Sequence, residues 1–349
     1  MREATAPRQL RLDLLKLLCA QCIMLHHFSV YGPFAQALER SAPALSAWLF
    51  DYGRMAVQVF LVLGGYLAAA SLQRLASARP MRLGSVLWRR YLRLIGPLLA
   101  ALLLVSAAAA LVRPWLQDDF VPAAPSWAQV LSHLVLMQDV LGIEALSVGV
   151  WYVAIDFQLY ALLALLIWLG TRVPAVPRLT QGLVVVLMGA SLFYANLQPD
   201  WDVAALYFFG AYGLGVMAYQ AQQMPHPKRL LLGLTLVVLL ALVWAFRERL
   251  VLALFTLWLL GTLPARSRTW PTGVQRWVGR LGGSSYGLFL THFAVLLLVN
   301  ALVAQWGELG AGATWLVLLA SVLLCTGLGL AFTRFVEQPL AARLGLARG

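Results

Sequence analysis

Charged side chains are scarce in this sequence, and long apolar runs separate them. Only 11% of the 349 residues are charged and 61% are hydrophobic, whereas a soluble domain typically carries about 25% charge. A run of about 18 apolar residues is long enough to cross the hydrocarbon core of a bilayer. The sequence therefore predicts an all-α polytopic integral membrane protein with about ten transmembrane helices. The expected spans are 11–31, 55–72, 94–112, 148–169, 182–197, 203–220, 230–246, 250–264, 284–304 and 313–333.

The connections between these runs are mostly short and basic or rich in proline, so we expect one transmembrane domain over residues 1–349. One stretch, 126–146, is too polar to cross and is expected to lie at the outer interface or to re-enter the membrane. Its polar side chains include His133, Gln138, Asp139 and Glu144.

Lys and Arg are distributed unevenly over the expected connections. Of the 26 basic residues, 20 fall on the side of the N-terminus and 5 on the other side, with Lys16 inside the first span. Cytoplasmic loops are enriched in Lys and Arg, so both termini are predicted to be cytoplasmic. The same enrichment explains the net charge of +12 without nucleic acid as a partner. The five outer residues are Arg40, Arg54, Arg113, Arg247 and Arg249.

The first span carries ionisable groups, which are costly inside a membrane and therefore mark candidate functional sites. Lys16 and His27 are eleven residues apart, or about three helical turns and ~16 Å, so they share one face. Asp13 lies one turn from Lys16 and can pair with it. The alternative is a structural salt bridge and a histidine that hydrogen-bonds a neighbouring helix. His26 points about 100° away and reads as structural.

Two further spans carry charge. Arg90 and Arg93 share a helix face at the expected inner boundary of the third span, where they could bind phosphate in a bidentate manner. Plain positive-inside anchoring is the alternative. Asp156 and Tyr160 share a face in the outer half of the fourth span. A carboxylate at that depth must be paired or protonated, and a polar clamp between helices is the alternative.

The ninth span opens with small residues that permit close helix packing, as Gly64 and Gly65 do in the second. His292 lies about two turns deeper, either as a hydrogen-bonding wall of a pocket or as a chemical group. Glu337 follows the last span at the inner boundary. The histidines show no metal-ligand spacing, and the Cys-x-x-C of Cys19 and Cys22 lies inside a span, which favours buried side chains over a redox pair.

In this order, the motifs resemble those of the membrane-bound acyltransferase family 3, whose members acylate bacterial cell-surface sugars and related small molecules. The resemblance runs from Asp13 to Pro339. The residues that carry it are Asp13, Lys16 and His27; 57–67; Arg90 and Arg93 before Ile95 and Pro97; Trp151, Asp156, Gln158 and Tyr160; Ser285, Tyr286, Leu290 and His292; and Glu337 and Pro339. The departures are Lys16 for the commoner Arg, Asp156 for Glu, Gly64 for Ser and Thr291 for Trp.

The resemblance implies an O-acyltransferase of the bacterial inner membrane, without the extracytoplasmic domain that some members carry. Acyl-CoA, most simply acetyl-CoA, would be the donor, and a hydroxyl of a cell-surface or lipid-linked glycan the acceptor, with no metal. Lys16, Arg90 and Arg93 would bind the donor phosphates, and His27 would act as base or carry the acyl group. Asp156 and Tyr160 would orient the acceptor. The supporting residues would be Asp13, Gln158, Ser285, Tyr286, His292 and Glu337.

A transporter or flippase of glycans or organic anions is the alternative function, since it could use the same polar residues as a relay. The sequence shows no pair of Gly- or Pro-broken helices in corresponding halves, as transporters with inverted repeats have. Binding of acyl-CoA discriminates between the two functions.

Overall fold

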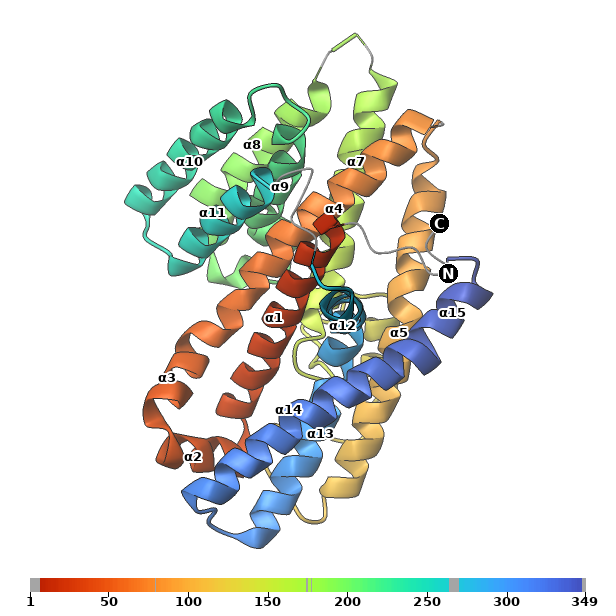
Figure 1. Cartoon of the computed structure of the whole chain (residues 1–349). Coiled ribbons are helices and arrows are strands. Elements are labelled where there is room, and N and C mark those ends of the chain that lie inside the picture. Colours follow the sequence, from red (N-terminus) through yellow and green to blue (C-terminus); the bar gives the residue numbers. More distant parts are fainter. Residues whose placement is uncertain (1–6, 79, 174, 177, 264–269, 347–349) are drawn as a thin grey trace. The chain divides into compact units, whose positions relative to one another are not determined.

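The computed structural model describes residues 7–78, 80–173, 175, 176, 178–263 and 270–346, and within these ranges every regular element is a helix (Figure 1). Helices are expected in lipid, because each backbone N–H and C=O must find its partner within the segment. The polytopic, all-helical class is thus confirmed. Five basic residues that enter the orientation prediction lie outside the described residues: Arg2, Arg79, Arg266, Arg268 and Arg348.

Each of the ten predicted spans coincides with a helix. These helices are α1 (Pro7–Val30), α4 (Ala56–Ala78), α5 (Leu83–Val112), α7 (Trp151–Arg172), α8 (Leu179–Phe193), α9 (Ala205–Ala221), α10 (Pro227–Trp244), α11 (Glu248–Gly261), α13 (Ser285–Trp306) and α14 (Ala311–Phe332). Seven helical segments of the described chain are long and apolar enough to cross a membrane, or eight if the bent pair of α1 and α2 counts as one span. At 17 and 14 residues, α9 and α11 are shorter. The count of ten and the cytoplasmic termini stay predictions.

The remaining helices are short. They are α2 (Gly32–Ser41), α3 (Pro43–Tyr52), α6 (Trp127–Leu134), α12 (Thr272–Gly283) and α15 (Gln338–Arg343). The polar stretch 126–146 contains α6 and turns, and it provides no candidate span, as predicted. A capping box starts α6: the Gln129 backbone N–H donates to the Ser126 hydroxyl, and the Ser126 backbone N–H donates to the Gln129 side chain.

The chain forms two compact units. Unit 1 comprises 1–56, 93–150 and 266–349, and unit 2 comprises 57–92 and 151–265. The boundaries between them fall at the start of α4, inside α5, directly before α7 and between residues 265 and 266. Since each unit is assembled from separate chain segments, neither corresponds to a continuous stretch of sequence. The prediction of one transmembrane domain over 1–349 stays a prediction.

In unit 1, α13 and α14 lie side by side (Figure 1), and α1 packs against α12 and α13. The contact between α13 and α14 depends on glycine. A Cβ added to Gly287 would lie 2.6 Å from the carbonyl oxygen of Gly329, and a Cβ on Gly329 would lie 2.7 Å from the Leu288 backbone. Small residues let helix backbones approach closely where lipid gives no hydrophobic driving force.

A sharp bend of 95° separates α1 from α2. Gly32 occupies the bend with a φ of +78°, which disfavours a side chain. The fully buried side chain of Asn300, on α13, accepts a hydrogen bond at 2.9 Å from the backbone N–H of Phe34 in the first turn of α2. The bend is therefore held by α13, a helix far away in the sequence, and α1 ends where α13 contacts α2.

In unit 2, α9 is buried on nearly all sides and contacts α7, α8, α10 and α11. A helix that is apolar all round belongs in a protein interior. Gly65 of α4 and Gly215 of α9 form a close crossing, since a Cβ on Gly65 would overlap the Tyr212 carbonyl and a Cβ on Gly215 the Val62 carbonyl. The predicted close packing at Gly64 and Gly65 is confirmed at Gly65.

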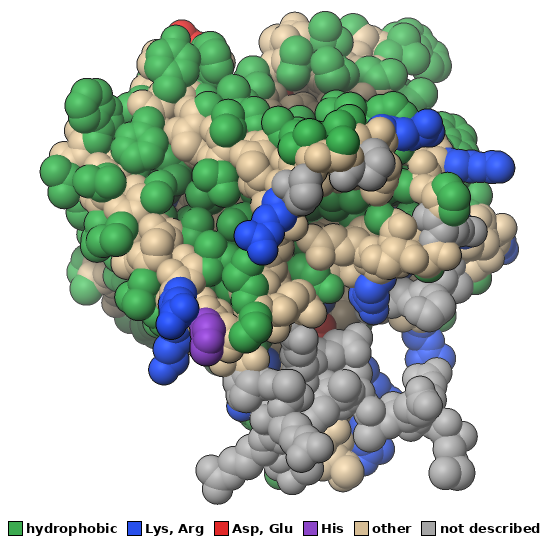
Figure 2. All heavy atoms as spheres, turned by 90° about the horizontal axis from the view of Figure 1, so that it is seen from above, with side chains coloured by type: hydrophobic (Ala, Val, Ile, Leu, Met, Phe, Trp, Pro, Cys, Tyr) green, Lys and Arg blue, Asp and Glu red, His purple; other side chains and the backbone are tan. Residues whose placement is uncertain are grey.

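Large apolar side chains remain exposed along the outer helices. On α14, Leu316, Leu319, Leu323 and Leu324 are each more than half exposed. Figure 2 shows hydrophobic side chains over much of the face it presents, with Lys and Arg side chains gathered among them and few acidic ones. Exposed leucines on a long helix are expected where lipid is the solvent.

Candidate active site

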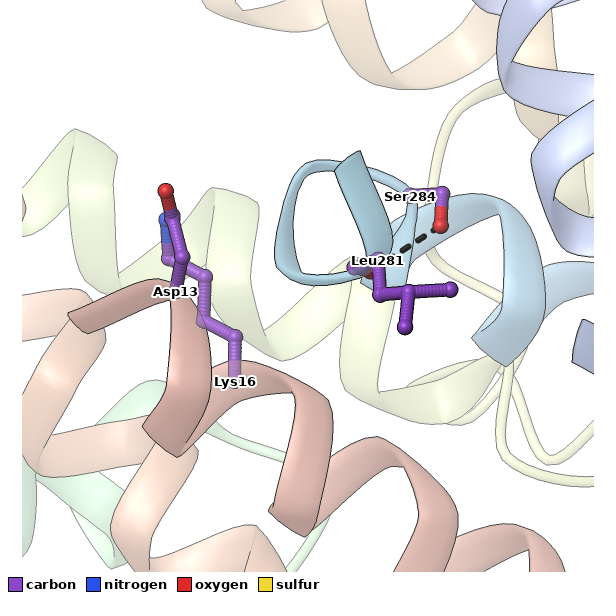
Figure 3. A network of polar contacts seen from close by, with 4 residues as sticks. All are labelled: Asp13, Lys16, Leu281 and Ser284. Atoms are coloured by element: carbon purple, nitrogen blue, oxygen red, sulfur yellow. Dashed lines mark hydrogen bonds and ion pairs between the residues drawn. The ribbon is translucent and has the colours of Figure 1, made fainter. Parts of the chain in front are cut away.

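The predicted ion pair in α1 is present. Lys16 Nζ lies 3.1 Å from Asp13 Oδ1, and the two side chains are 20% and 8% exposed. Figure 3 shows both beside Leu281 and Ser284, at the end of α12. The backbone of α12 approaches closely here, since a Cβ on Gly282 would overlap the Asp13 carbonyl. One of the three Lys16 donors serves Asp13, which leaves two for other acceptors.

Eleven residues further along α1, His27 meets His292 of α13. Their Nδ1 and Nε2 atoms are 2.7 Å apart, and the rings are nearly parallel, with centroids 4.9 Å apart. His292 Nδ1 lies 2.7 Å from the Phe289 carbonyl oxygen and 3.3 Å from that of Leu288. His292 is only 1% exposed, whereas His27 is partly exposed. Two imidazoles thus form a chain that runs from the interior of unit 1 toward a more accessible ring.

Aromatic side chains and one glycine surround this chain. The Tyr31 ring lies 5.9 Å from the His27 ring and 5.7 Å from that of Phe120, which the segment after α5 supplies. Gly149, with a φ of +80°, brings the backbone before α7 to the site, since a Cβ there would lie 3.7 Å from His27 Cε1 and 3.3 Å from Phe289. A side chain at 149 would fill the space beside His27.

His26 has a different environment, as predicted. The His26 Nδ1 lies 2.9 Å from the Leu49 carbonyl oxygen of α3, and a Cβ on Gly53 would lie 2.8 Å from the Cβ of His26. The imidazole therefore donates to a backbone carbonyl and packs α1 against α3. His26 is a structural residue that adjoins the candidate site in sequence.

In unit 2, Arg90 of α5 forms an ion pair with Asp156 of α7. The Arg90 guanidinium also lies over the ring of Tyr160, 4.9 Å from its centroid. Among the described residues, the buried Arg90 Nε has no hydrogen-bond partner. Sequence reasoning had put Arg90 at the inner boundary of the third span and Asp156 in the outer half of the fourth, ~12 Å from its outer end. Because α5 starts at Leu83, Arg90 lies seven residues inside the helix, where it reaches Asp156.

Gln158, predicted as a supporting residue, joins two helices of unit 2. Its Oε1 accepts a hydrogen bond at 3.0 Å from the backbone N–H of Ala205, the first residue of α9. That N–H has no partner within its own helix. Gln158 therefore anchors the start of α9 on α7.

The remaining predicted residues of unit 1 lie at the start of α13 and just after the end of α14. The Tyr286 hydroxyl donates to the Leu94 carbonyl at 3.2 Å, directly after Arg93 on α5. Glu337 ends a π-helical turn (Thr333–Glu337), and its Oε2 accepts from the Thr333 hydroxyl at 3.2 Å. Such turns are rare and frequent at functional sites. Ser285 is buried at the start of α13.

Sequence reasoning missed Tyr31, Phe120, Gly149 and Asn300. Tyr31 and Gly149 gave a signal that could have been recognised in the sequence. Tyr31 is an aromatic residue one turn from His27, and Gly149 is a glycine at the start of the fourth expected span. Phe120 and Asn300 act across long chain separations, and nothing in their local sequence indicates it. Within the described ranges, no three His, Cys, Asp or Glu side chains gather as a metal site would require.

Comparison with known families decides the class. A model of the family described as an acyltransferase domain matches residues 9–334. The chain belongs to this acyltransferase family, family 3. Comparisons with curated proteins and with solved structures find no match. The match includes α1 and α13, so both histidines of the candidate site lie within the acyltransferase domain, and the protein is a membrane acyltransferase.

Proposed function

We propose that this acyltransferase moves an acyl group from acyl-CoA, most simply acetyl-CoA, to a hydroxyl of a cell-surface or lipid-linked glycan or a related small molecule. The proposed setting is the bacterial inner membrane. The observation that carries the proposal is His27, a partly exposed residue inside a membrane helix whose imidazole forms a hydrogen bond to a buried histidine. A hydroxyl needs such a base to attack a thioester at neutral pH.

The reaction balances with one histidine as base. His27 takes the proton of the acceptor hydroxyl while the hydroxyl oxygen bonds to the thioester carbonyl carbon. The carbon–sulfur bond then breaks, and the proton returns from His27 to the sulfur, which releases free CoA. Transfer of the acyl group through His27 itself is the variant in which His27 attacks first. Both variants need the imidazole to be neutral at the start.

Lys16 and Arg93 are the proposed partners of the donor phosphates in unit 1. Coenzyme A is polyanionic, and Lys16 keeps two donors beyond its bond to Asp13. Arginine binds phosphate oxygens in a bidentate manner. The donor role of Arg90 and the acceptor-orienting roles of Asp156 and Tyr160 stay predictions, now for residues that form an ion pair and a cation–π contact.

The test compares the same substitution at adjacent positions. An asparagine amide can replace Nδ1 of histidine, so His27→Asn and His26→Asn each keep the one hydrogen bond to the neighbouring helix. Only His27→Asn removes the proposed base. General acid–base catalysis is worth ~100 to 10,000-fold in rate, so we expect a loss of that size in His27→Asn and little loss in His26→Asn.

The measurement is transfer of radiolabelled acetyl from acetyl-CoA to bacterial envelope glycans by purified protein, with thermal stability and acetyl-CoA binding measured on each variant. Both variants should melt near the wild type and bind the donor. Wild-type turnover in His27→Asn would remove His27 from the chemistry. If the wild-type protein bound no acyl-CoA, the donor assignment would be wrong and a carrier function would be favoured.

A further inference from the structure

His292 is buried behind His27, and its surroundings determine which of its nitrogens carries hydrogen. Its Nδ1 faces the carbonyl oxygens of Phe289 and Leu288, at 2.7 and 3.3 Å. Carbonyl oxygens only accept, so Nδ1 must carry the hydrogen. In the neutral ring, Nε2 then has a free lone pair and can only accept. The backbone of α13 therefore fixes the tautomer of His292.

The same reasoning extends to His27. Its Nδ1 lies 2.7 Å from the accepting Nε2 of His292, so Nδ1 carries the hydrogen and donates it. The hydrogen of a neutral imidazole can occupy only one nitrogen, which leaves Nε2 of His27 as the basic atom. Among the described residues, no hydrogen bond is recorded at this Nε2. A free neutral histidine side chain in water prefers the opposite tautomer, with its hydrogen on Nε2.

We infer that His292 is a positioning residue that holds His27 in the tautomer with a basic Nε2, through a chain from the α13 carbonyls to the active site. The inference rests on the proposed function, since it assigns His292 a role only if His27 is the base. When His27 takes up the acceptor proton at Nε2, its Nδ1–H still donates to His292. The positive charge then lies against an oriented lone pair in an apolar surrounding, where such an interaction is strong.

Two other roles for His292 fit the geometry less well. His292 is 1% exposed and both its nitrogens are engaged, so it cannot reach a substrate as the base. A shared metal ion would need different spacing. Two nitrogens at 2.0–2.1 Å from one tetrahedral zinc lie about 3.3 Å apart, whereas these two are 2.7 Å apart, the distance of a hydrogen bond.

The experiment uses two amides that differ in reach. In His292→Gln, the side-chain oxygen can replace Nε2 and accept from His27. In His292→Asn, the amide can replace only Nδ1, so it keeps the bond to the α13 carbonyl and loses His27. We expect His292→Gln to retain transfer within about 10-fold and His292→Asn to lose ~100 to 10,000-fold, the range for general-base catalysis. His226→Leu, at an exposed position, is the control.

The direct readout is the tautomer. With ¹⁵N-histidine, the protein shows only five imidazoles, and His27→Asn identifies the signals of His27. We expect wild-type His27 to be protonated at Nδ1 alone, and His292→Asn to shift it to the Nε2-protonated form while the melting temperature stays near wild type. The inference is overturned if wild-type His27 is protonated at Nε2, if the tautomer of His27 is the same in His292→Asn as in the wild type, or if His292→Gln and His292→Asn transfer the acyl group equally well. Those results leave His27 as the base, whereas full activity of His27→Asn removes His27 as the base, and a wild-type protein that transfers no acyl group from acyl-CoA overturns the proposed function itself.

Discussion

The pair of His27 and His292 in unit 1 and the pair of Arg90 and Asp156 in unit 2 both place polar groups inside apolar helices, but they offset the cost of burial differently. The histidines are joined by a 2.7 Å hydrogen bond and end on backbone carbonyls, so the pair can be neutral. The second pair combines two full charges. Removing charge from water is far more costly than removing a hydrogen-bonded neutral group.

This difference separates what each pair can do. A neutral imidazole chain can take up a proton and release it, because the starting state holds no charge and the protonated state keeps the hydrogen bond between His27 and His292. In the ion pair, each charge compensates the other. Protonation of Asp156 would therefore leave the Arg90 guanidinium without its counter-charge. The comparison favours the histidines of unit 1 for proton transfer, while the donor role of Arg90 and the acceptor-orienting role of Asp156 stay predictions for two residues that form an ion pair.

The largest stability effect is expected from breaking the ion pair. Arg90→Met leaves the partly buried Asp156 without its partner, and breaking an ion pair in this way costs up to about 3–5 kcal/mol when the pair is fully buried. The double variant Arg90→Met with Asp156→Leu removes both charges and should recover most of that loss. Thermal unfolding of the purified protein in detergent measures both. Equal instability of the single and double variants would mean that the pair is not the source of the cost.

The double variant also tests the predicted donor role of Arg90. If Arg90 only forms structure, the double variant should bind acetyl-CoA as the wild type does. If it contacts the donor, binding should fall although the fold is restored. In unit 1, the single variant His27→Asn is expected to differ from Arg90→Met: it should keep the stability of the wild type and lose acyl transfer.

A smaller effect is expected where helix backbones touch. In Gly65→Ala, the new Cβ overlaps the Tyr212 carbonyl of α9, and forcing atoms into a packed contact costs about 1–3 kcal/mol. Gly64→Ala is the matched control, because a Cβ there lies 3.5 Å from the Tyr212 ring and 3.8 Å from Asp156, in ordinary contact. Thermal unfolding of the two variants should differ clearly. Similar melting would mean that α4 and α9 do not cross at Gly65.

Local patterns predicted much of this structure. The apolar runs predicted every long helix, and the spacing of Asp13 and Lys16 predicted their ion pair, because both residues lie within one turn. Gly65 was predicted as a packing residue from another local feature, because a small side chain in an apolar run permits close approach of another backbone. The family motifs, in order, predicted the acyltransferase class.

Contacts between helices could not be predicted in the same way. A buried polar group must find a partner, but periodicity does not say which one. Arg90 and Asp156 are 66 residues apart, and His27 and His292 are 265 apart. The short helix α9 shows another limit: its apolar side chains are buried in protein, whereas composition alone favours a lipid-facing span.

The smallest effect is expected at a third polar group, His133 of α6. It extends the comparison to a histidine with no proposed catalytic role. It is fully buried, its Nδ1–H donates to the Gln129 carbonyl at 2.7 Å, and its Nε2 accepts from the Leu146 backbone N–H at 3.3 Å. Only the neutral ring can make both bonds. Burial lowers the pKa of His133 below its usual 6.5, and the Gln129 carbonyl and Asp139 oppose that change.

Because the folded state binds this proton more weakly than the unfolded state, stability from His133 is complete above pH 6.5 and is lost as the pH falls toward the lowered pKa. We therefore expect the hydrogen-exchange protection of the Leu146 amide to fall about 5-fold between pH 7.5 and 5, which corresponds to one hydrogen bond of ~1 kcal/mol. In His133→Gln, an amide oxygen can accept from Leu146 at any pH, so protection should not change. The same pH response in both proteins would show that another group controls this segment. In contrast with His27, neither form of residue 133 should alter acyl transfer at pH 7.5 by more than a small factor, since both nitrogens of His133 already hold the fold.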